Sequence, residues 1–339
     1  MFELEKIVRK NILSLKPYSS ARDEFSGNDG VFLDANENPF GDLNRYPDPH
    51  QNALKKKLSD LKCIATENIF VGNGSDEVID LAFRIFCHPG KDKALTFSPT
   101  YGMYDVSAAI NNIELIKIPL DDHFQIDFHS LEQHLKDENL KLIFICSPNN
   151  PTGNHLNNID WILNSFKGIV IIDEAYIDFS TEKSFIDKIE QHSNLIVSQT
   201  FSKAWGLAAA RVGTAYSNNK IISLYNKVKA PYNVSELNQK AALSALENYA
   251  EFKNQIAEIL VQRKWLEKKL NRVGVVTKVY PSDANFLLVE TTDADDIYEK
   301  LIAQKIITRN RNNLVKNCIR ITVGLPDENE KLINELNKL

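Results

Sequence analysis

Short runs of consecutive apolar residues, separated by helical patterns, constrain this chain more than any other feature of its sequence. They occupy residues 69–72, 94–98, 142–146, 169–172 and 195–197. Because these runs are apolar throughout instead of alternating with polar residues, they are typical of strands that helices cover on both faces. Strands in alternation with helices predict an α/β domain with a mostly parallel sheet.

The segments between and after these runs predict helices and a second unit. A helix is expected over 75–86, with the serine at its start as the N-cap. Residues 235–270 contain neither Gly nor Pro, which predicts one long helix or two abutting ones. Apolar runs at 285–289 and 319–323, with a helical pattern over 327–339, predict a smaller α+β unit.

The N-terminal region predicts little regular structure. The first 30 residues favour a helix followed by an irregular arm, and residues 36–49 are polar and interrupted by prolines. We therefore expect three parts: an arm and helix over 1–30 that pack with the small domain, a large domain over 31–255, and a small C-terminal domain over 256–339.

Composition and charge exclude several classes of protein. The 339 residues are 43% hydrophobic and 25% charged, which is ordinary for a globular protein. A net charge of −5 argues against a nucleic-acid partner, and no apolar run approaches the roughly 20 residues of a membrane helix. The N-terminus does not resemble a signal peptide, and the four cysteines are widely scattered, so we expect a cytoplasmic protein without membrane contact.

Lys203 is the most informative single residue. It follows a predicted strand within a loop of small residues, with Ser202 before it and Arg211 shortly after. Burial and neighbouring positive charge lower the pKa of a lysine and make its amine nucleophilic, which is the chemistry of Schiff-base formation. A serine hydroxyl and a planar guanidinium group nearby suit a phosphate.

An acid stands at the end of another predicted strand. Asp173 ends the apolar run at 169–172, so we expect its carboxylate at the carboxyl edge of the sheet, where α/β proteins form their sites. A buried carboxylate is costly unless it meets a cation, and a protonated pyridine ring would provide one. Tyr176 follows three residues later, within reach of the same ring.

Further loops follow other predicted strands. Residues 72–77 (GNGSDE) form a glycine-rich turn into a helix, and such a turn presents N–H groups to a single phosphate. Residues 147–153 (SPNNPTG) follow a second strand, and Tyr101 follows a third with an aromatic face to offer. Each feature alone has an ordinary explanation: a surface lysine, a helix-capping aspartate, an Asn-Pro turn or a core tyrosine.

Taken together, the segments GNGSDE, NPTG, DEAY (173–176) and Ser202-Lys203 with Arg211 resemble, in this order, the motifs of fold-type I aminotransferases. The resemblance extends over essentially the whole chain. It implies a pyridoxal-phosphate-dependent enzyme. It also implies a large domain with a mostly parallel seven-stranded sheet flanked by helices, and a smaller α+β domain.

The resemblance implies a role for each matching residue. Lys203 would bind pyridoxal 5'-phosphate covalently and act as general base, while Asp173 would pair with the pyridine nitrogen. Asn150 and Tyr176 would hold the phenolic oxygen of the ring, and Tyr101 would stack on its face. The implied catalytic set is Lys203, Asp173 and Tyr176, and the phosphate would be bound near Ser75, Asp76, Glu77, Ser202 and Arg211.

The N-terminal third resembles histidinol-phosphate aminotransferases within this class. The matching segments are residues 33–41 (LDANENPFG), 44–49 (NRYPDP), 15–18 (LKPY) and 20–22 (SAR). By this resemblance Tyr46 would reach across a dimer interface to the cofactor phosphate of the partner subunit. The protein would then be a homodimer with shared active sites.

Such an enzyme transfers an amino group from L-histidinol phosphate to 2-oxoglutarate, in L-histidine biosynthesis, and must bind phosphate and carboxylate groups in turn. Guanidinium groups suit both anions. Arg320 matches the family's anion-binding arginine and Arg309 a second one, although the nearby Arg311 leaves this second match open. Tyr18 would donate its hydroxyl to the substrate phosphate, and Asn73 is a weaker candidate for the same pocket.

Other functions fit the same scaffold. An aromatic amino acid aminotransferase or a threonine-phosphate decarboxylase would share these motifs, and its substrate would distinguish it. A non-catalytic cofactor sensor would need an attached DNA-binding domain, whereas the predicted scaffold begins near residue 31 and occupies the rest of the chain.

Overall fold

Two β-sheets organise the part of the chain that this computed structural model describes, residues 2–19 and 30–339. The strands of the larger sheet are β1 (Ile69–Asn73), β2 (Lys93–Ser98), β3 (Glu114–Pro119), β4 (Leu140–Cys146), β5 (Ile169–Asp173), β6 (Leu195–Thr200) and β7 (Val212–Tyr216). Their order is β1-β7-β6-β5-β4-β2-β3, and only β7 runs antiparallel to its neighbours. The predicted seven-stranded, mostly parallel sheet is confirmed.

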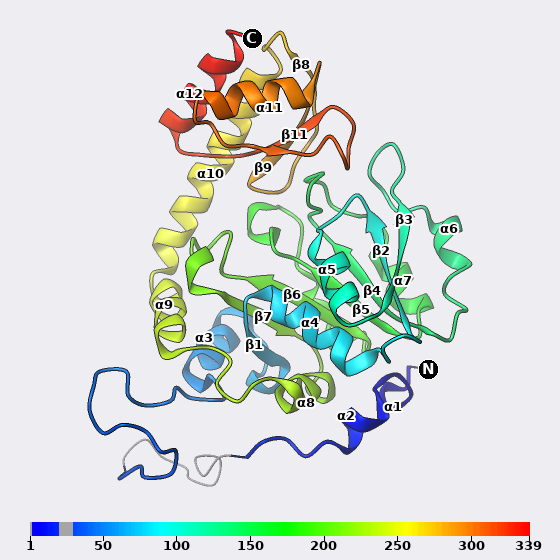
Figure 1. Cartoon of the computed structure of the whole chain (residues 1–339), viewed down its shortest axis with the longest axis vertical. Coiled ribbons are helices and arrows are strands. Elements are labelled where there is room, and N and C mark those ends of the chain that lie inside the picture. The colour runs from blue at the N-terminus through cyan, green and yellow to red at the C-terminus, as the bar shows by residue number, and fades with distance from the viewer. Residues whose placement is uncertain (1, 20–29) are drawn as a thin grey trace.

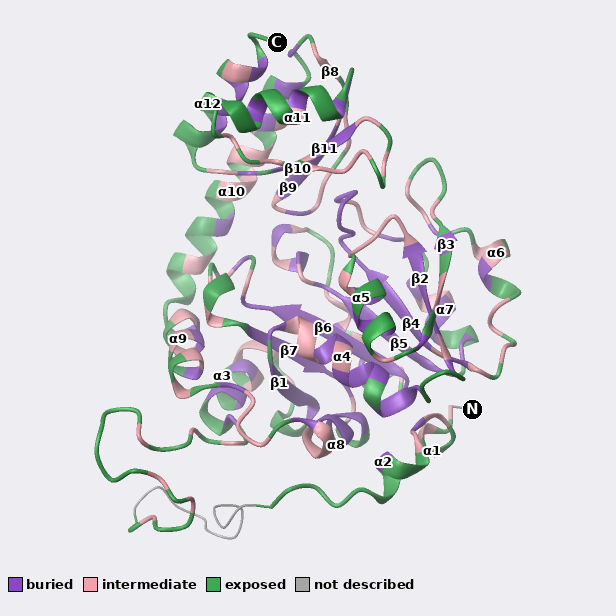
Figure 2. Ribbon diagram, in the orientation of Figure 1, coloured by how far each residue is buried: buried purple, intermediate pink, exposed green. Residues whose placement is uncertain are grey.

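Helices cover both faces of this sheet (Figure 1). They are α3 (Asn52–Lys62), α4 (Ser75–Phe86), α5 (Met103–Ile110), α6 (Phe128–Glu132), α7 (Ile159–Ser165), α8 (Asn219–Val228) and α9 (Glu236–Glu247). Within β4, Ile143 and Ile145 pack into one apolar core, whereas Leu142 and Phe144 pack into another. Because each face of the strand has its own core, the run is apolar throughout, and Figure 2 shows these strands largely buried.

The start of α4 differs from the prediction. Gly74, with φ +76°, occupies the N-cap position and Ser75 is the first helical residue, so the expected serine cap is wrong. The reason is steric, since a Cβ on Gly74 would lie 2.6 Å from Nη2 of Arg211. A Cβ on Gly213 of β7 would likewise overlap the backbone of Gly74 and Ser75. Glycine at both positions lets the turn before α4 lie directly against β7.

The smaller sheet consists of β8 (Val276–Val279), β9 (Phe286–Thr291), β10 (Arg309–Asn310) and β11 (Cys318–Thr322), in the antiparallel order β10-β11-β9-β8. A separate apolar core joins it to α11 (Ala294–Ala303), α12 (Pro326–Leu336) and the end of α10 (Tyr249–Leu270). α9 and α10 meet at Asn248, so the long helical stretch is two abutting helices. Since α10 continues past residue 256, the domain boundaries near residues 31 and 256 stay a prediction.

The N-terminal helix is divided into α1 (Leu4–Ile7) and α2 (Lys10–Ser14), and it packs on the large domain. Val8 and Ile12 join the apolar core of α4 and α8, and Nζ of Lys227 in α8 donates hydrogen bonds to the carbonyls of Ile12 and Leu13. The expected packing with the small domain is therefore wrong, and Figure 1 places the two regions at opposite ends of the molecule.

Residues 31–50 contain neither helix nor strand, as predicted for 36–49, and form a largely exposed arm (Figure 2). Residues 20–22, part of the family resemblance, lie outside the described residues. Among the helices that the structure describes, none has the length and apolar character needed to cross a membrane. Short 3-10 helices occur at η2 (Thr66–Asn68), η3 (Ile177–Phe179), η4 (Phe185–Lys188) and η5 (Ala208–Ala210).

Candidate active site

A pocket of ≈ 430 Å³ opens at the carboxyl ends of β4, β5 and β6, with residues of β10 and β11 on its other side. Parallel strands end at one edge of a sheet, so residues far apart in the sequence meet there. The pocket brings together most of the residues singled out in the sequence: Ser75, Asp76, Tyr101, Asn150, Asp173, Tyr176, Ser202, Lys203, Arg211, Arg309 and Arg320.

Asp173, the last residue of β5, is 2% exposed. Its Oδ2 accepts a hydrogen bond of 2.9 Å from the Tyr104 hydroxyl, and its Oδ1 accepts one of 3.2 Å from the backbone N–H of Ala175. Burial raises the pKa of this carboxyl to about 6, although both hydrogen bonds oppose the rise. The ionised acid therefore favours a cation in the pocket in front of it.

Lys203 lies in the loop after β6, with its Nζ 5.8 Å from the centre of the Tyr176 ring. The residue retains contact with solvent through the open pocket. Loss of hydration lowers the pKa of the amine and Arg320 lowers it further, while Asp173 opposes both effects. A larger fraction of neutral amine makes this lysine a better nucleophile and base.

A candidate phosphate site lies at the N-terminus of α4, where Ser75 and Asp76 begin the helix. Arg211 connects its two sides, since Nη2 lies 3.2 Å from Oδ2 of Asp76 and Nη1 donates to Oγ of Ser202 at 3.3 Å. The Tyr101 hydroxyl donates to Oδ1 of Asp76 at 3.0 Å. Free N–H groups at a helix N-terminus, with a guanidinium and a hydroxyl beside them, suit a phosphate.

Asn150, Tyr176 and Arg320 form a hydrogen-bonded row across the pocket. Nδ2 of Asn150 donates to the Tyr176 hydroxyl at 3.4 Å, and Nη1 of Arg320 donates to Oδ1 of Asn150 at 2.5 Å. Phe286 of β9 supports both ends, with its ring edge-to-face with Tyr176 and 5.1 Å from the Arg320 guanidinium. The row therefore links the large domain to the small sheet.

Three arginines concentrate positive charge on the small-domain side of the pocket. Arg309 and Arg320 are direct partners in the β10–β11 register, and Arg311 follows β10. Burial and then the charges of Arg320 and Arg309 lower the pKa of Arg311 to about 10. The Nε–H groups of Arg311 and Arg320 are buried and donate to no acceptor among the described residues. Such a cluster is suited to anionic ligands.

Two of the expected residues, Glu77 and Asn73, lie outside the pocket lining. Oε2 of Glu77 accepts hydrogen bonds from the backbone N–H of Asn73, at 2.5 Å, and from Nδ2 of Asn233, at 2.9 Å. Neither Glu77 nor Asn73 belongs to the pocket lining. The Glu77 side chain instead braces the turn that precedes α4.

Two others lie on the exposed N-terminal arm. Tyr18 is 71% exposed and Tyr46 is 48% exposed, and the Tyr46 ring stacks on Tyr232 at a centroid distance of 4.3 Å. Neither lines the pocket of its own chain.

The sequence matches the family described as aminotransferase class I and II over residues 27–336. The chain belongs to this family. A histidinol-phosphate aminotransferase of Christiangramia forsetii is 51% identical over 345 residues, which cover 100% of this chain and 98% of the relative. One of Cytophaga hutchinsonii is 49% identical over 344 residues, covering 99% of each chain.

The fold of this aminotransferase is also found in solved structures. That of histidinol-phosphate aminotransferase from Sinorhizobium meliloti, in complex with pyridoxal-5'-phosphate, superposes with a TM-score of 0.80 at 23% identity. The match covers 88% of this chain and 83% of that one. The predicted fold type I is confirmed.

Four further residues of the aminotransferase line the pocket: Cys146, Ala175, Thr200 and Arg311. Cys146 and Thr200 end β4 and β6, and Cys146 pairs in register with Asp173. The position at the end of an apolar strand, which drew attention to Asp173, would also have identified Cys146. The sequence indicated Arg311 only as an alternative to Arg309 for the second anion-binding arginine.

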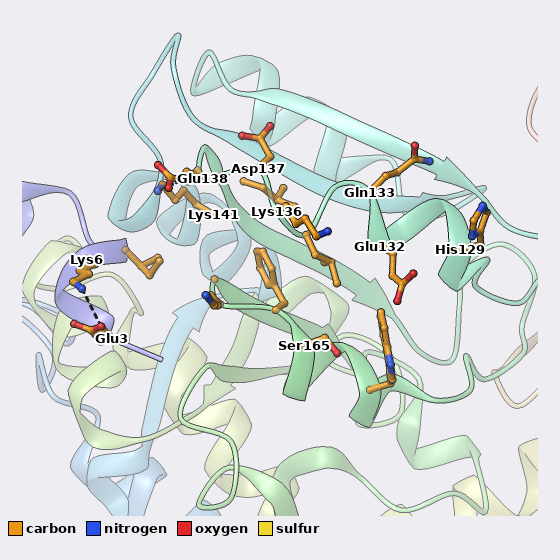
Figure 3. A pocket seen from close by; sticks show the side chains of 17 residues that line it. Glu3, Lys6, His129, Glu132, Gln133, Lys136, Asp137, Glu138, Lys141 and Ser165 are labelled. Atoms are coloured by element: carbon orange, nitrogen blue, oxygen red, sulfur yellow. Dashed lines mark hydrogen bonds and ion pairs between the residues drawn. The ribbon is translucent and has the colours of Figure 1, made fainter. Parts of the chain in front are cut away.

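A larger hollow of ≈ 1190 Å³ lies at the opposite, amino-terminal edge of the sheet, between α1, α7 and the segment that begins with α6 (Figure 3). Its charges balance locally. Lys6 pairs with Glu3 at 2.9 Å, and Asp137 pairs with Lys93 at 3.1 Å. Among the described residues, no group of three or more His, Cys, Asp or Glu side chains could hold a metal ion. The lining of this hollow also has no cluster of arginines like that of the pocket at the carboxyl edge.

Proposed function

We propose that this aminotransferase transfers the amino group of L-histidinol phosphate to 2-oxoglutarate, giving 3-(imidazol-4-yl)-2-oxopropyl phosphate and L-glutamate, as a step of L-histidine biosynthesis. The observation that carries the proposal is the cluster of Arg309, Arg311 and Arg320 in one pocket with Lys203. One substrate carries a phosphate and the other a second carboxylate, and guanidinium groups bind both. The two relatives of about 50% identity, both of this name, support it over their full length.

The pocket fits pyridoxal 5'-phosphate as the cofactor. Asp173 is buried and receives its hydrogen bonds from neutral donors, so a protonated ring nitrogen would supply the missing cation. The N-terminus of α4, with Ser75, Ser202 and Arg211, would bind the phosphate. When bound, the cofactor supplies an aldehyde that links to the substrate amine and a ring that takes up the electron pair of the Cα–H bond.

The residues of the chain would then bind, orient and move protons. Nζ of Lys203, whose pKa loss of hydration and Arg320 lower, would remove the Cα proton of the substrate and then deliver it to the carbon that carried the aldehyde. Tyr101 would pack on the face of the ring, and Asn150 and Tyr176 would hold its phenolic oxygen through their hydrogen-bonded pair.

The anionic ends of the substrates would meet the small-domain side. Arg320 would bind the carboxylate of glutamate and Arg309 the substrate phosphate. Tyr18 would donate its hydroxyl to that phosphate, and Asn73 is a weaker candidate for the same pocket. Arg311 competes with Arg309 for the second task, because it lines the same pocket and is the more buried of the two.

The exposed arm supports a homodimer with shared sites. Val31 and Leu33 are each 88% exposed and Phe40 is 81% exposed, which is unusual for large apolar side chains close together in the sequence. A second copy of the chain would cover them, and Tyr46 would then reach the cofactor phosphate of the partner subunit. All four cysteines are free thiols, in keeping with the cytoplasmic location that we also propose.

The absorption spectrum of the purified protein, before and after addition of L-histidinol phosphate without a keto acid, tests the function. Replacement of the band of the aldehyde form by that of the amine form would support cofactor, reaction and substrate together. A change with phenylalanine but not with histidinol phosphate would identify an aromatic aminotransferase, and release of CO₂ from threonine phosphate would identify a decarboxylase. A protein that binds no pyridoxal phosphate would refute the proposal.

A further inference from the structure

A fully buried tyrosine lies directly behind Asp173. Tyr104, in the first turn of α5, is 0% exposed, and its hydroxyl donates a 2.9 Å hydrogen bond to Oδ2 of Asp173. Its ring stacks on Phe144 at a centroid distance of 5.0 Å and lies edge-on to Tyr101 at 5.7 Å. These contacts fix the ring from both sides, so the hydroxyl has a defined position at the carboxylate.

The Tyr104 hydroxyl can only act as a donor to this acid. Burial, and then the charge of Asp173, raise the pKa of the hydroxyl well above its ordinary value, so it keeps its proton at all ordinary pH. The backbone N–H of Ala175 donates to the other carboxylate oxygen. With a donor on each oxygen, the ionised form of Asp173 is stabilised and its plane is fixed.

Other groups around Asp173 do not replace this bond. Burial acts in the opposite direction, since it favours the neutral acid, and Asp76 of α4 adds like charge. Lys203, across the pocket, favours the ionised form but more weakly than the Tyr104 hydrogen bond. Three other titratable groups lie close enough for the charge of Asp173 to raise their pKa values. They are Cys146 of β4, Tyr101 before α5 and Tyr176 after β5.

We propose that Tyr104 is a positioning residue that keeps Asp173 ionised and aimed at the ring nitrogen of the cofactor. The proposal rests on the proposed use of pyridoxal phosphate. Tyr104 itself does not line the pocket, so it acts through Asp173 and not by contact with the ligand. Because Tyr101 would pack on the same ring, the backbone bond from Tyr104 N–H to the Tyr101 carbonyl, 3.4 Å, connects both supports of the ring.

The test is Tyr104→Phe in the full-length protein, which removes the hydroxyl and keeps the ring. Equilibrium titration of the apoprotein should show pyridoxal phosphate bound about tenfold more weakly, because one hydrogen bond to a charged group is lost. An analogue with carbon in place of the ring nitrogen should bind wild type and variant equally. As the pH is lowered, the affinity for pyridoxal phosphate should begin to fall at a higher pH in the variant than in wild type. The reason is that Asp173, without the Tyr104 hydrogen bond, would take up its proton at a higher pH.

Tyr225→Phe is the matched control. Tyr225 is also 0% exposed and belongs to the same apolar core, but its hydroxyl donates to the carbonyl of Val78 at 3.2 Å, away from Asp173. It should leave the affinity for pyridoxal phosphate unchanged. In an Asp173→Asn background, Tyr104→Phe should likewise have no further effect on that affinity.

An equal loss with cofactor and analogue, or unchanged affinity for the cofactor, would overturn the role of Tyr104. The role would also be overturned if Tyr104→Phe weakened cofactor binding as much in the Asp173→Asn background as in wild type. This comparison in the Asp173→Asn background also decides the matter if the single variant Tyr104→Phe is unstable. Wild-type protein that binds no pyridoxal phosphate would instead refute the proposed function, and this inference with it.

Discussion

Arg309 and Arg320 are direct partners across β10 and β11, so two positive side chains stand side by side at the edge of the pocket. Like charges opposite each other in a sheet are destabilising. Arg311 adds a third charge, and burial of Arg311 and Arg320 lowers the pKa of each guanidinium. The fold tolerates this repulsion at a site where an anionic ligand would relieve it.

This arrangement predicts that anions stabilise the protein through Arg320. 2-Oxoglutarate should raise the Tm of wild type, and Arg320→Gln should lose most of that rise. The same variant should lower kcat/KM for glutamate by about a hundredfold, since charge-assisted hydrogen bonds to its carboxylate would be removed. Thermal unfolding with and without 2-oxoglutarate, together with steady-state kinetics, measures both effects. Arg309→Gln and Arg311→Gln serve as comparisons, and the one with the larger rise in KM for histidinol phosphate identifies the phosphate ligand. A full 2-oxoglutarate shift in Arg320→Gln would contradict this account.

Lys203 is predicted to be essential for turnover. By the proposed mechanism Lys203→Ala would remove both the covalent link to the cofactor and the general base, so activity should fall below detection. Borohydride reduction of wild type loaded with pyridoxal phosphate, followed by mass spectrometry, should place the cofactor on Lys203. Lys167→Ala, at an exposed position before β5, should retain wild-type activity and labelling. Near-normal turnover by Lys203→Ala would remove this lysine from the mechanism.

Asp173 should make the stability of the apoprotein depend on pH. Burial raises the pKa of its carboxyl from 3.8 to about 6, so the folded state binds this proton more tightly than the unfolded state. The free energy of unfolding therefore falls as the pH rises between these two values. Each unit of difference between the two pKa values corresponds to about 1.4 kcal/mol. Ionisation of Asp173 therefore lowers the free energy of unfolding by on the order of 3 kcal/mol near neutral pH.

Asp173→Asn should remove this part of the dependence. In urea unfolding of the apoproteins at about pH 8, the variant should be the more stable, and the two curves should converge near about pH 4. Glu174, whose pKa burial raises to about 7, titrates in the same range but is present in both proteins. If the free energy of unfolding depended on pH in the same way in wild type and variant, Asp173 would not be the source of that dependence.

Glu77 is predicted to support the cofactor phosphate without touching it. Its carboxylate holds the backbone of Asn73 and the side chain of Asn233, and so shapes the turn into α4. Glu77→Ala should weaken pyridoxal phosphate binding by about tenfold, whereas Glu77→Gln, whose amide oxygen can accept the same bonds, should stay within about twofold. Titration with pyridoxal, which lacks the phosphate, is the control and should show little difference. An equal loss with both ligands would point to general damage of the fold.

Much of the fold and of the pocket could be predicted because the signals are local. An apolar run that ends in Asp173 marks both a buried strand and the edge where a site forms. β7 gives no such signal, since it is short and includes Gly213 among small residues, and β3 lies at the sheet edge with several residues exposed. Both strands are recognised only from their neighbours.

Other features depend on contacts between distant segments. The Glu77 side chain accepts a hydrogen bond from Asn233, which is 156 residues away. The sequence around Glu77 gives no signal that predicts this contact. The docking of the N-terminal helices is similarly decided by Lys227 of α8. The Tyr104–Asp173 bond joins residues 69 positions apart on different elements, so the motif around Asp173 does not reveal it.

The exposed arm leads to a prediction about subunits. If Tyr46 serves the partner's site, then Tyr46→Ala and Lys203→Ala damage different parts of one composite site. In a heterodimer of the two variants, one site would combine the Lys203 of one chain with the partner subunit's Tyr46, and the other would lack both. Each homodimer should therefore be impaired, while the purified heterodimer, prepared with two affinity tags, should recover about half of the wild-type activity per dimer. If Tyr46 acts within its own chain, no site of the heterodimer is complete and activity stays at the level of the homodimers. Because Tyr46 is 48% exposed and outside its own pocket, we expect the recovery.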